Sequence, residues 1–351
     1  MVLALVIAAA IWGFGILARV PVRVRCIQIA GLWVAIVLLH LVLPTAHPLR
    51  VNLGGSAAPW LMLGAAAGLV WGYMVVLRRL RRRALTVEPA ATNAPKPLFS
   101  AAELDRYARH IVLREVGGPG QKKLKEARVL VLGAGGLGAP ALQYLAAAGV
   151  GTIGVIDDDV VEVSNLQRQV IHNDARIGQP KVFSARQAML ELNPHIEVLP
   201  YNRRFTADIA NDLIADFDLV LDGTDNFDTR YLANRAAARA GKPLISGALS
   251  QWEGQLSVFD PAQGAPCYEC IFPKAPAAGL APSCAEAGVM GTLPGVVGAM
   301  MAGEAIKLIT GAGQVMRGDM LIYDALYSET RRMKLSRRVD CPVCNVLAGK
   351  K

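Results

Sequence analysis

The 351-residue sequence predicts an α/β domain with a doubly wound, mostly parallel sheet, preceded by transmembrane helices. Two observations support this fold class. The apolar run Val129–Leu132 is followed by a glycine-rich turn that opens a helix, the pattern of a nucleotide-binding strand, turn and helix. Long apolar segments occupy the first part of the chain, and the roughly 250 residues after them are enough for one such domain.

Residues 1–83 are expected to form a membrane anchor with about three helices, in the segments 1–18, 26–43 and 59–77. Each approaches the roughly 20 residues that span a bilayer. The first segment lacks the basic start and the cleavage site of a signal peptide. Arginines gather after the first and third segments, so the positive-inside rule predicts an inner or plasma membrane protein whose catalytic domain is cytoplasmic.

The net charge of +9 lies largely in the arginines beside the third apolar segment. Anionic lipid headgroups are the natural partner of such a cluster, so we expect contact with a membrane surface and no nucleic-acid binding. Residues 84–97 are expected to be a linker, because Glu88–Pro97 is rich in proline and alanine. The enzyme domain is then predicted over residues 98–351.

The glycine turn predicts a phosphate cradle. Gly133, Gly135 and Gly138 fit the G-x-G-x-x-G spacing, in which glycine lets the backbone approach a phosphate. Asp157 ends the next apolar run, at the distance expected for a carboxylate that binds a ribose. A NAD-dependent dehydrogenase would share these features, so they leave the nucleotide open.

The residues that follow favour a triphosphate. Asn165, Arg168 and Lys181 lie within one strand-helix-strand interval, whereas hydride transfer needs no such cluster of cations. The chain contains no G-x-x-x-x-G-K-[ST] motif, so a P-loop is not the means of holding the phosphates. ATP is therefore the expected nucleotide.

From about residue 98 to residue 345 the chain resembles the ubiquitin-activating superfamily in its bacterial form, the molybdopterin-synthase adenylyltransferases and the related ThiF-type enzymes of the thiamine pathway. The resemblance rests on motifs that occur in the family order. They are RYARHI at 106–111, GAGGLG at 133–138, SNLQRQ at 164–169, GQPK at 178–181, DGTDN at 222–226, CYEC at 267–270, CAEAGV at 284–289 and CPVC at 341–344. It implies a Rossmann-like doubly wound sheet.

The resemblance also implies the chemistry. ATP would react with the C-terminal glycine carboxylate of a small ubiquitin-fold sulfur-carrier protein that ends in Gly-Gly, giving an acyl adenylate and pyrophosphate. Arg168 and Lys181 suit the charge that develops at the phosphates. Arg109 matches a family arginine that reaches the nucleotide of the other subunit, which implies a homodimer. The implied nucleotide shell also includes Gly136, Ser164 and Asn226.

Asp225 matches the family aspartate associated with Mg²⁺. It follows the apolar stretch 219–221, and open α/β sheets bind ligands at the carboxyl ends of their strands. A carboxylate there can hold Mg²⁺, which offsets phosphate charge. Asp222 is the competing candidate, with turn capping as its structural alternative.

Cys267, Cys270, Cys341 and Cys344 form two C-x-x-C pairs. Four thiolates suit a closed tetrahedral Zn²⁺ site that would fix the C-terminal part of the domain. The alternatives are a redox pair or disulfides, and neither pair has the strand-helix context of a redox motif.

Several residues receive weaker predictions. Cys284 aligns with a cysteine that some relatives use to bond the carrier or its sulfur, and a buried inert thiol is its alternative. Because only seven residues follow Cys344, we expect a separate sulfur-donor protein.

His110, His172 and His195 lack a metal-ligand spacing and are given no catalytic role. The apolar stretch 289–309, with its small residues and Glu304, predicts a packed helix in its second half.

The function predicted is ATP-dependent adenylation of a sulfur carrier, in first place the small subunit of molybdopterin synthase in molybdenum cofactor biosynthesis. Activation of the thiamine-pathway carrier or another carrier is the nearest alternative. The two remaining alternatives are a NAD-dependent oxidoreductase and a membrane scaffold without catalysis. A scaffold would have no need of the four charged residues Arg109, Arg168, Lys181 and Asp225.

Overall fold

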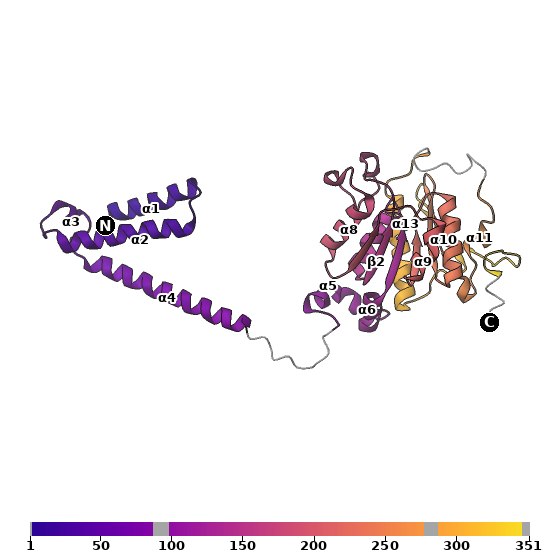
Figure 1. Cartoon of the computed structure of the whole chain (residues 1–351), viewed down its shortest axis with the longest axis horizontal. Helices are drawn as coiled ribbons and strands as arrows, with labels where there is room; N and C mark the ends of the chain where they lie inside the picture. The colour runs from indigo at the N-terminus through magenta and orange to yellow at the C-terminus, as the bar shows by residue number, and fades with distance from the viewer. Residues whose placement is uncertain (1, 87–97, 277–286, 346–351) are drawn as a thin grey trace. The chain divides into compact units, whose positions relative to one another are not determined.

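The structure is a computed structural model that describes residues 2–86, 98–276 and 287–345. The chain divides into two compact units, residues 1–96 and 97–351 (Figure 1). The predicted linker, residues 84–97, falls mostly outside the described residues, and the helix before it continues to Thr86.

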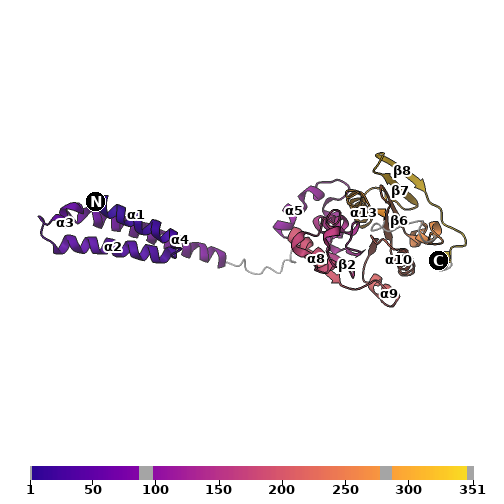
Figure 2. The same ribbon diagram turned by 90° about the horizontal axis from the view of Figure 1, so that it is seen from above.

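The N-terminal unit is helical (Figure 2). Its helices are α1 (Val2–Leu17), α2 (Val22–Val42), α3 (Pro48–Asn52) and α4 (Ala58–Thr86). Helix α2 packs against both α1 and α4. The indole N–H of Trp33 donates to the Trp60 carbonyl at 2.8 Å, and the indole N–H of Trp60 donates to the Leu53 carbonyl at 2.9 Å. Most large apolar side chains on α2 and α4 are nevertheless exposed.

Among the described residues, three helices have the length and composition to cross a membrane: α2, the Ala58–Leu80 part of α4, and a helix of the second unit, Leu293–Thr310. The predicted first span corresponds to α1, which has 16 residues and is too short to be counted with them. At 1.5 Å per residue a helix of that length is shorter than the roughly 30 Å hydrocarbon core. Helix Leu293–Thr310 is half buried in its own unit.

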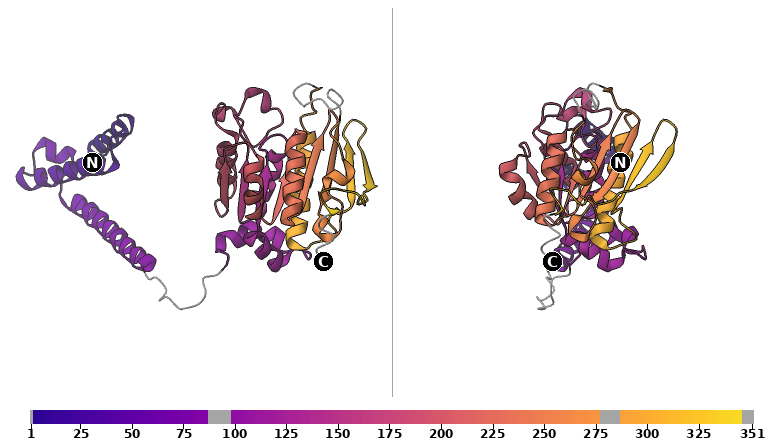
Figure 3. Two further views of the ribbon diagram at one scale, coloured as in Figure 1. Left: turned by 45° about the vertical axis from the view of Figure 1, so that its right-hand side comes forward. Right: turned by 90° about the vertical axis from the view of Figure 1, so that its right-hand side faces the viewer.

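The second unit is built on one eight-stranded sheet, in the order β3-β2-β1-β4-β5-β6-β7-β8. The strands are β1 (Arg128–Leu132), β2 (Thr152–Ile156), β3 (Glu197–Tyr201), β4 (Leu219–Asp222), β5 (Leu244–Leu249), β6 (Glu253–Phe259), β7 (Asp319–Asp324) and β8 (Glu329–Lys334). Strands β1 to β5 pair in parallel, and β6 to β8 extend the sheet antiparallel. Figure 3 shows the β7–β8 hairpin at one edge of this sheet.

The helices of this unit cover both faces of the sheet. They are α5 (Ala101–Ile111), α6 (Gly117–Glu126), α7 (Gly138–Ala148), α8 (Lys181–Leu192), α9 (Ala207–Ala215), α10 (Phe227–Ala240), α11 (Tyr268–Ile271) and α13 (Leu293–Thr310). Helix α7 packs against α8 and α13, while α9 packs against α10. The apolar core is accordingly split into two clusters, and the four apolar residues Val129–Leu132 of β1 alternate between them. The predicted α/β sheet is confirmed.

The strand order reverses between β1 and β4, which are neighbours although two strands separate them in sequence. At such a reversal the loops leaving adjacent strands diverge and open a crevice at the carboxyl edge. The glycine turn follows β1, and Asp222 ends β4 in register with Leu132. The fold therefore brings the two predicted nucleotide motifs to the same crevice.

Candidate functional site

A cavity of about 690 Å³ lies at this crevice. It is lined by eight of the residues predicted from sequence: Gly133, Gly135, Gly136, Asp157, Arg168, Lys181, Asp225 and Asn226. Its volume and its mixed apolar and charged lining suit a nucleotide. The individual roles of these eight residues stay predictions, but all eight lie at one site.

The glycine turn is shaped by close backbone contact. Gly133 has φ +91°, a left-handed conformation that favours glycine. A Cβ placed on Gly138 would lie 1.9 Å from the Gly133 carbonyl oxygen, so no larger residue fits there without moving the turn. Helix α7 begins at Gly138, directly after the turn that leaves β1. This arrangement offers N–H groups and the positive end of a helix to an anion.

Asp157 follows β2 and holds the turn in place. Its Oδ2 accepts from the Ala134 N–H at 2.7 Å, and its Oδ1 accepts from the Asp159 N–H at 2.9 Å. Burial raises the pKa of Asp157, and these hydrogen bonds and the charge of Lys181 oppose the rise. The carboxylate keeps further lone pairs, so it can also accept from a ribose hydroxyl.

The two predicted phosphate-binding cations have intramolecular partners. Lys181, the first residue of α8, has a side chain only 7% exposed, and its Nζ contacts Asp159 Oδ2 at 2.8 Å. Arg168 donates to the Ser164 carbonyl at 3.0 Å. Both side chains line the cavity, so an entering phosphate would exchange these contacts for its own oxygens.

Asp222 and Asp225 differ in exposure. Asp222 is fully buried, and its Oδ1 accepts from the N–H and the hydroxyl of Thr224 at 3.1 and 2.7 Å. Its Oδ2 accepts from Ser246 Oγ at 3.2 Å, and Arg230 Nη1 lies 4.0 Å away. Asp225 is exposed and lines the cavity.

The capping role considered for Asp222 therefore has direct support. Asn226, the neighbour of Asp225, caps α10 by accepting from the Thr229 N–H at 2.9 Å. Of the two candidates Asp222 and Asp225, the exposed carboxylate is that of Asp225, and oxygen ligands of this kind suit Mg²⁺.

Other predicted residues are not among those that line the cavity. Gly138 lies behind the turn. Ser164 and Asn165 form a local turn, in which Ser164 Oγ contacts Glu162 and Asn165 Oδ1 accepts from the Glu162 N–H at 3.3 Å. Arg109 is exposed on α5 and absent from the cavity of its own chain. Cys284 lies outside the described residues.

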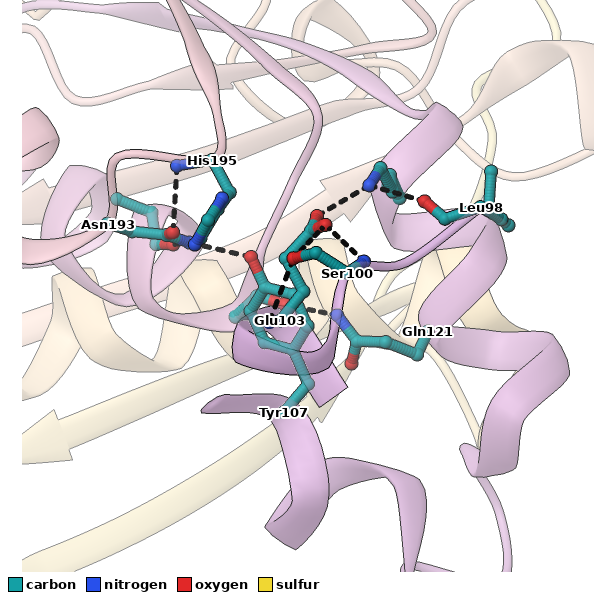
Figure 4. A network of polar contacts seen from close by, with 10 residues as sticks. Leu98, Ser100, Glu103, Tyr107, Gln121, Asn193 and His195 are labelled. Atoms are coloured by element: carbon teal, nitrogen blue, oxygen red, sulfur yellow. Dashed lines mark hydrogen bonds and ion pairs between the residues drawn. The ribbon is translucent and has the colours of Figure 1, made fainter. Parts of the chain in front are cut away.

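Helix α5, which carries Arg109, begins with a capping box (Figure 4). Ser100 Oγ accepts from the Glu103 N–H at 3.3 Å, and the Glu103 carboxylate accepts from the Ser100 N–H at 2.9 Å. Lys125 of α6 donates to the same carboxylate. Burial alone would raise the pKa of Glu103, but the hydrogen bonds from Lys125 and Ser100 together outweigh it and lower the pKa to about 2.

The next turn of α5 is also fixed. Asn193 Nδ2 donates to the Tyr107 hydroxyl at 2.8 Å and to the Ala146 carbonyl at 2.7 Å, and Arg106 donates to the Leu192 carbonyl at 2.7 Å. Helix α5 is thus tied to the ends of α7 and α8, and Arg109 projects from a helix of fixed position.

The four paired cysteines converge in a buried cluster. The Sγ atoms of Cys267 and Cys341 are 3.5 Å apart, those of Cys270 and Cys344 are 3.3 Å apart, and those of Cys267 and Cys270 are 3.8 Å apart. A tetrahedron with Zn–S bonds of about 2.3 Å has S–S edges of about 3.8 Å, so the cluster fits a zinc ion. All four are free thiols rather than disulfides.

Sequence reasoning did not single out several polar residues at or behind the cavity. Asp159 pairs with Lys181, and Arg230 donates to the Thr224 carbonyl, one residue before Asp225. Arg203 and Arg204 line the cavity from the loop after β3. The acidic run 157–159 was a visible signal for Asp159, whereas the arginines depend on tertiary placement. The packed helix expected in the second half of 289–309 is confirmed as α13, which begins earlier, at Leu293, and places Met301 in the core.

Comparison with known proteins gives a consistent result. The sequence profile of the ThiF family matches residues 107–343. The chain is 50% identical over 250 residues to the sulfur carrier protein adenylyltransferase of Thermus thermophilus. The aligned region covers 70% of this chain and 92% of the relative. It is 48% identical over 246 residues to the SAMP-activating enzyme E1 of Haloferax volcanii, covering 70% of this chain and 90% of the relative.

A third relative is longer. The chain is 49% identical over 259 residues to the probable adenylyltransferase/sulfurtransferase MoeZ of Mycobacterium tuberculosis, covering 73% of this chain and 64% of MoeZ. Among solved structures, MccB of E. coli with ATP has a TM-score of 0.60 at 23% identity, covering 71% of this chain and 76% of MccB. That likeness concerns the fold.

Proposed function

The chain belongs to the ThiF family, and from that membership we propose that it is an adenylyltransferase that uses ATP to activate the C-terminal carboxylate of a sulfur-carrier protein. The observation that carries the proposal is the cavity in which the glycine turn, Asp157, Arg168, Lys181 and Asp225 meet. The names of the relatives favour this reaction over hydride transfer.

In the reaction, a carboxylate oxygen of the carrier forms a bond to the α-phosphorus of ATP, and the bond from that phosphorus to the pyrophosphate oxygen breaks. The attack brings two anions together, so fixed donors must offset the charge. Lys181 and Arg168 supply positive charge, and the free amides of the glycine turn supply N–H donors. Mg²⁺ at Asp225 would neutralise phosphate oxygens.

We assign the finer features as follows. The sulfur carrier is in first place the small subunit of molybdopterin synthase, with the thiamine-pathway carrier as the alternative. Zn²⁺ holds the C-terminal part of the domain through the four cysteines, whose spacing supports this. Helices α2 and α4, with α1 beside them, anchor the chain in the membrane.

Arg109 is proposed to act in a homodimer. It is exposed on a helix that is tied to the domain, and it does not reach the cavity of its own chain. Mixing an Arg109→Ala chain with a Lys181→Met chain tests this, because in mixed dimers one of the two sites regains both residues. Activity of the mixture above that of either variant supports the proposal, and equal inactivity contradicts it.

The reaction itself is tested by exchange of labelled pyrophosphate into ATP, with the full chain in detergent micelles. Each candidate carrier is supplied intact or without its terminal glycine. Exchange that requires the terminal glycine supports adenylation of that carboxylate, and the preferred carrier indicates the pathway. A folded, zinc-containing protein that exchanges with no carrier would contradict the proposal.

A further inference from the structure

The peptide group between Ala134 and Gly135, inside the glycine turn, is held from behind by a buried histidine. The Ala134 N–H donates to Asp157 Oδ2 at 2.7 Å, while its carbonyl oxygen lies 3.0 Å from His172 Nε2. The other ring nitrogen, Nδ1, lies 2.8 Å from the hydroxyl of Ser184 on α8. His172 is 6% exposed and Ser184 is fully buried.

These contacts allow one arrangement of protons. A carbonyl oxygen only accepts, so Nε2 carries the ring proton and donates to Ala134. In the neutral ring Nδ1 is then the acceptor, and the Ser184 hydroxyl donates to it. Burial lowers the pKa of His172 to about 4, and the positive charges of Lys181 and Arg176 act in the same direction. The ring is therefore neutral at physiological pH, and its donor is fixed toward the turn.

The direction of this hydrogen bond determines the direction of the next amide. In a trans peptide the C=O and the following N–H point to opposite sides, and the described residues contain no cis peptide bond. Because His172 draws the Ala134 carbonyl inward, the Gly135 N–H points away from His172. Gly135 lines the cavity, and its amide has no hydrogen-bond acceptor among the described residues.

Glycine makes such a brace necessary. Residue 135 has no side chain to restrict its φ and ψ, so the peptide before it can rotate and turn its carbonyl toward the cavity. A carbonyl oxygen in that place would repel a phosphate. The hydrogen bond from His172, and the one from Ala134 to Asp157, restrain both sides of the turn against this rotation.

We propose that His172 is a positioning residue for nucleotide binding, which aims the Gly135 N–H at a phosphate oxygen of ATP and joins the glycine turn to helix α8. Ser184 lies one turn after Lys181 on α8, so one histidine side chain links two phosphate-binding elements. This inference rests on the proposed function in that its ligand is ATP.

The test is the dissociation constant of ATP, measured by calorimetry on the full chain in detergent micelles. His172→Leu removes the donor, and we expect affinity to fall about three- to tenfold, the range for one neutral hydrogen bond. His172→Gln places an amide donor near the position of Nε2 and should restore affinity to within about twofold of the unmodified chain. The matched control is His195→Leu, an exposed histidine outside the cavity, which should bind ATP normally.

A merely structural role would lower the melting temperature of both His172 variants without separating their ATP affinities. Folded His172→Leu protein with unchanged affinity, or a His172→Gln protein as weak as His172→Leu, would overturn the inference. If His172→Leu does not fold, Ser184→Ala serves instead, with an expected loss of about threefold in affinity and unchanged affinity as the contrary result. Absence of ATP binding by the unmodified chain would count against the proposed function instead.

Discussion

Replacing Glu103 by glutamine tests how strongly helix α5 is held. The substitution keeps the shape of the side chain and its contact with Ser100 but removes the charge that faces Lys125. Because α5 carries Arg109, loosening it should affect catalysis without changing the cavity of the same chain. We therefore expect Glu103→Gln to destabilise α5 locally and to lower pyrophosphate exchange.

The pKa of Glu103 provides the magnitude. A decrease from 4.5 to about 2 corresponds to roughly 3 kcal/mol of stabilisation at pH 7. The Lys125 side chain remains 27% exposed, so solvent screening reduces this to about 2 kcal/mol. Since the folded-state pKa is lowered, the stabilisation is fully present above pH 4.5 and is lost as the pH falls through 2. By pH 3.5 roughly a third or more of it should be gone.

Hydrogen–deuterium exchange of the α5 amides measures this local stability, with both proteins compared at the same pH so that intrinsic exchange rates cancel. The matched control is Asp105→Asn, an exposed acid on the same helix, which should exchange like the unmodified protein. A difference for Glu103→Gln that does not shrink from pH 7 to pH 3.5 would refute the electrostatic reasoning. No difference at pH 7 would refute the assignment of the anchor.

Three further changes test the site. Lys181→Met should lower pyrophosphate exchange about 100-fold by removing a fixed cation, and exchange within a few-fold of normal would exclude it from the reaction. Gly138→Ala should weaken ATP binding about 100-fold, because its Cβ would lie 1.9 Å from the Gly133 oxygen, whereas Gly303→Ala has open space and should bind normally; equal affinities would contradict the close-contact argument. Cys341→Ser should lose bound zinc, measured by atomic absorption, and should melt at lower temperature; full zinc content in that variant would contradict the four-thiolate site.

The sequence was informative where local pattern and function coincide. The apolar run 129–132 predicts strand β1, whose Val and Leu side chains are buried on both faces of the sheet. The apolar stretch 219–221 predicts strand β4 for the same reason. The glycine turn could be predicted because its backbone needs a conformation that only glycine adopts easily, as the positive φ of Gly133 shows. The count of spanning helices was less secure at the first span, because α1 has only 16 residues and is shorter than the helices that can cross a membrane.

The site was less predictable where partners come from distant segments. His172 has no sequence signal, because its importance arises only when the chain places it against Ala134 and Ser184. Arg230 likewise appears as an ordinary helix arginine until Asp222 and Thr224 are found beside it. A motif lists the residues that face a ligand, whereas the groups that support them are set by tertiary packing.

The contact between Lys181 and Asp159 has a consequence for selectivity among anions. The ammonium is almost covered, and it is already paired with a carboxylate at 2.8 Å. A small ion such as inorganic phosphate or chloride would have to displace that carboxylate with few other contacts to compensate. In the proposed function ATP would also engage the glycine turn and Asp157, so it could replace the carboxylate more readily than a small anion with few other contacts. The free enzyme should therefore retain its ATP affinity in buffers rich in phosphate and chloride.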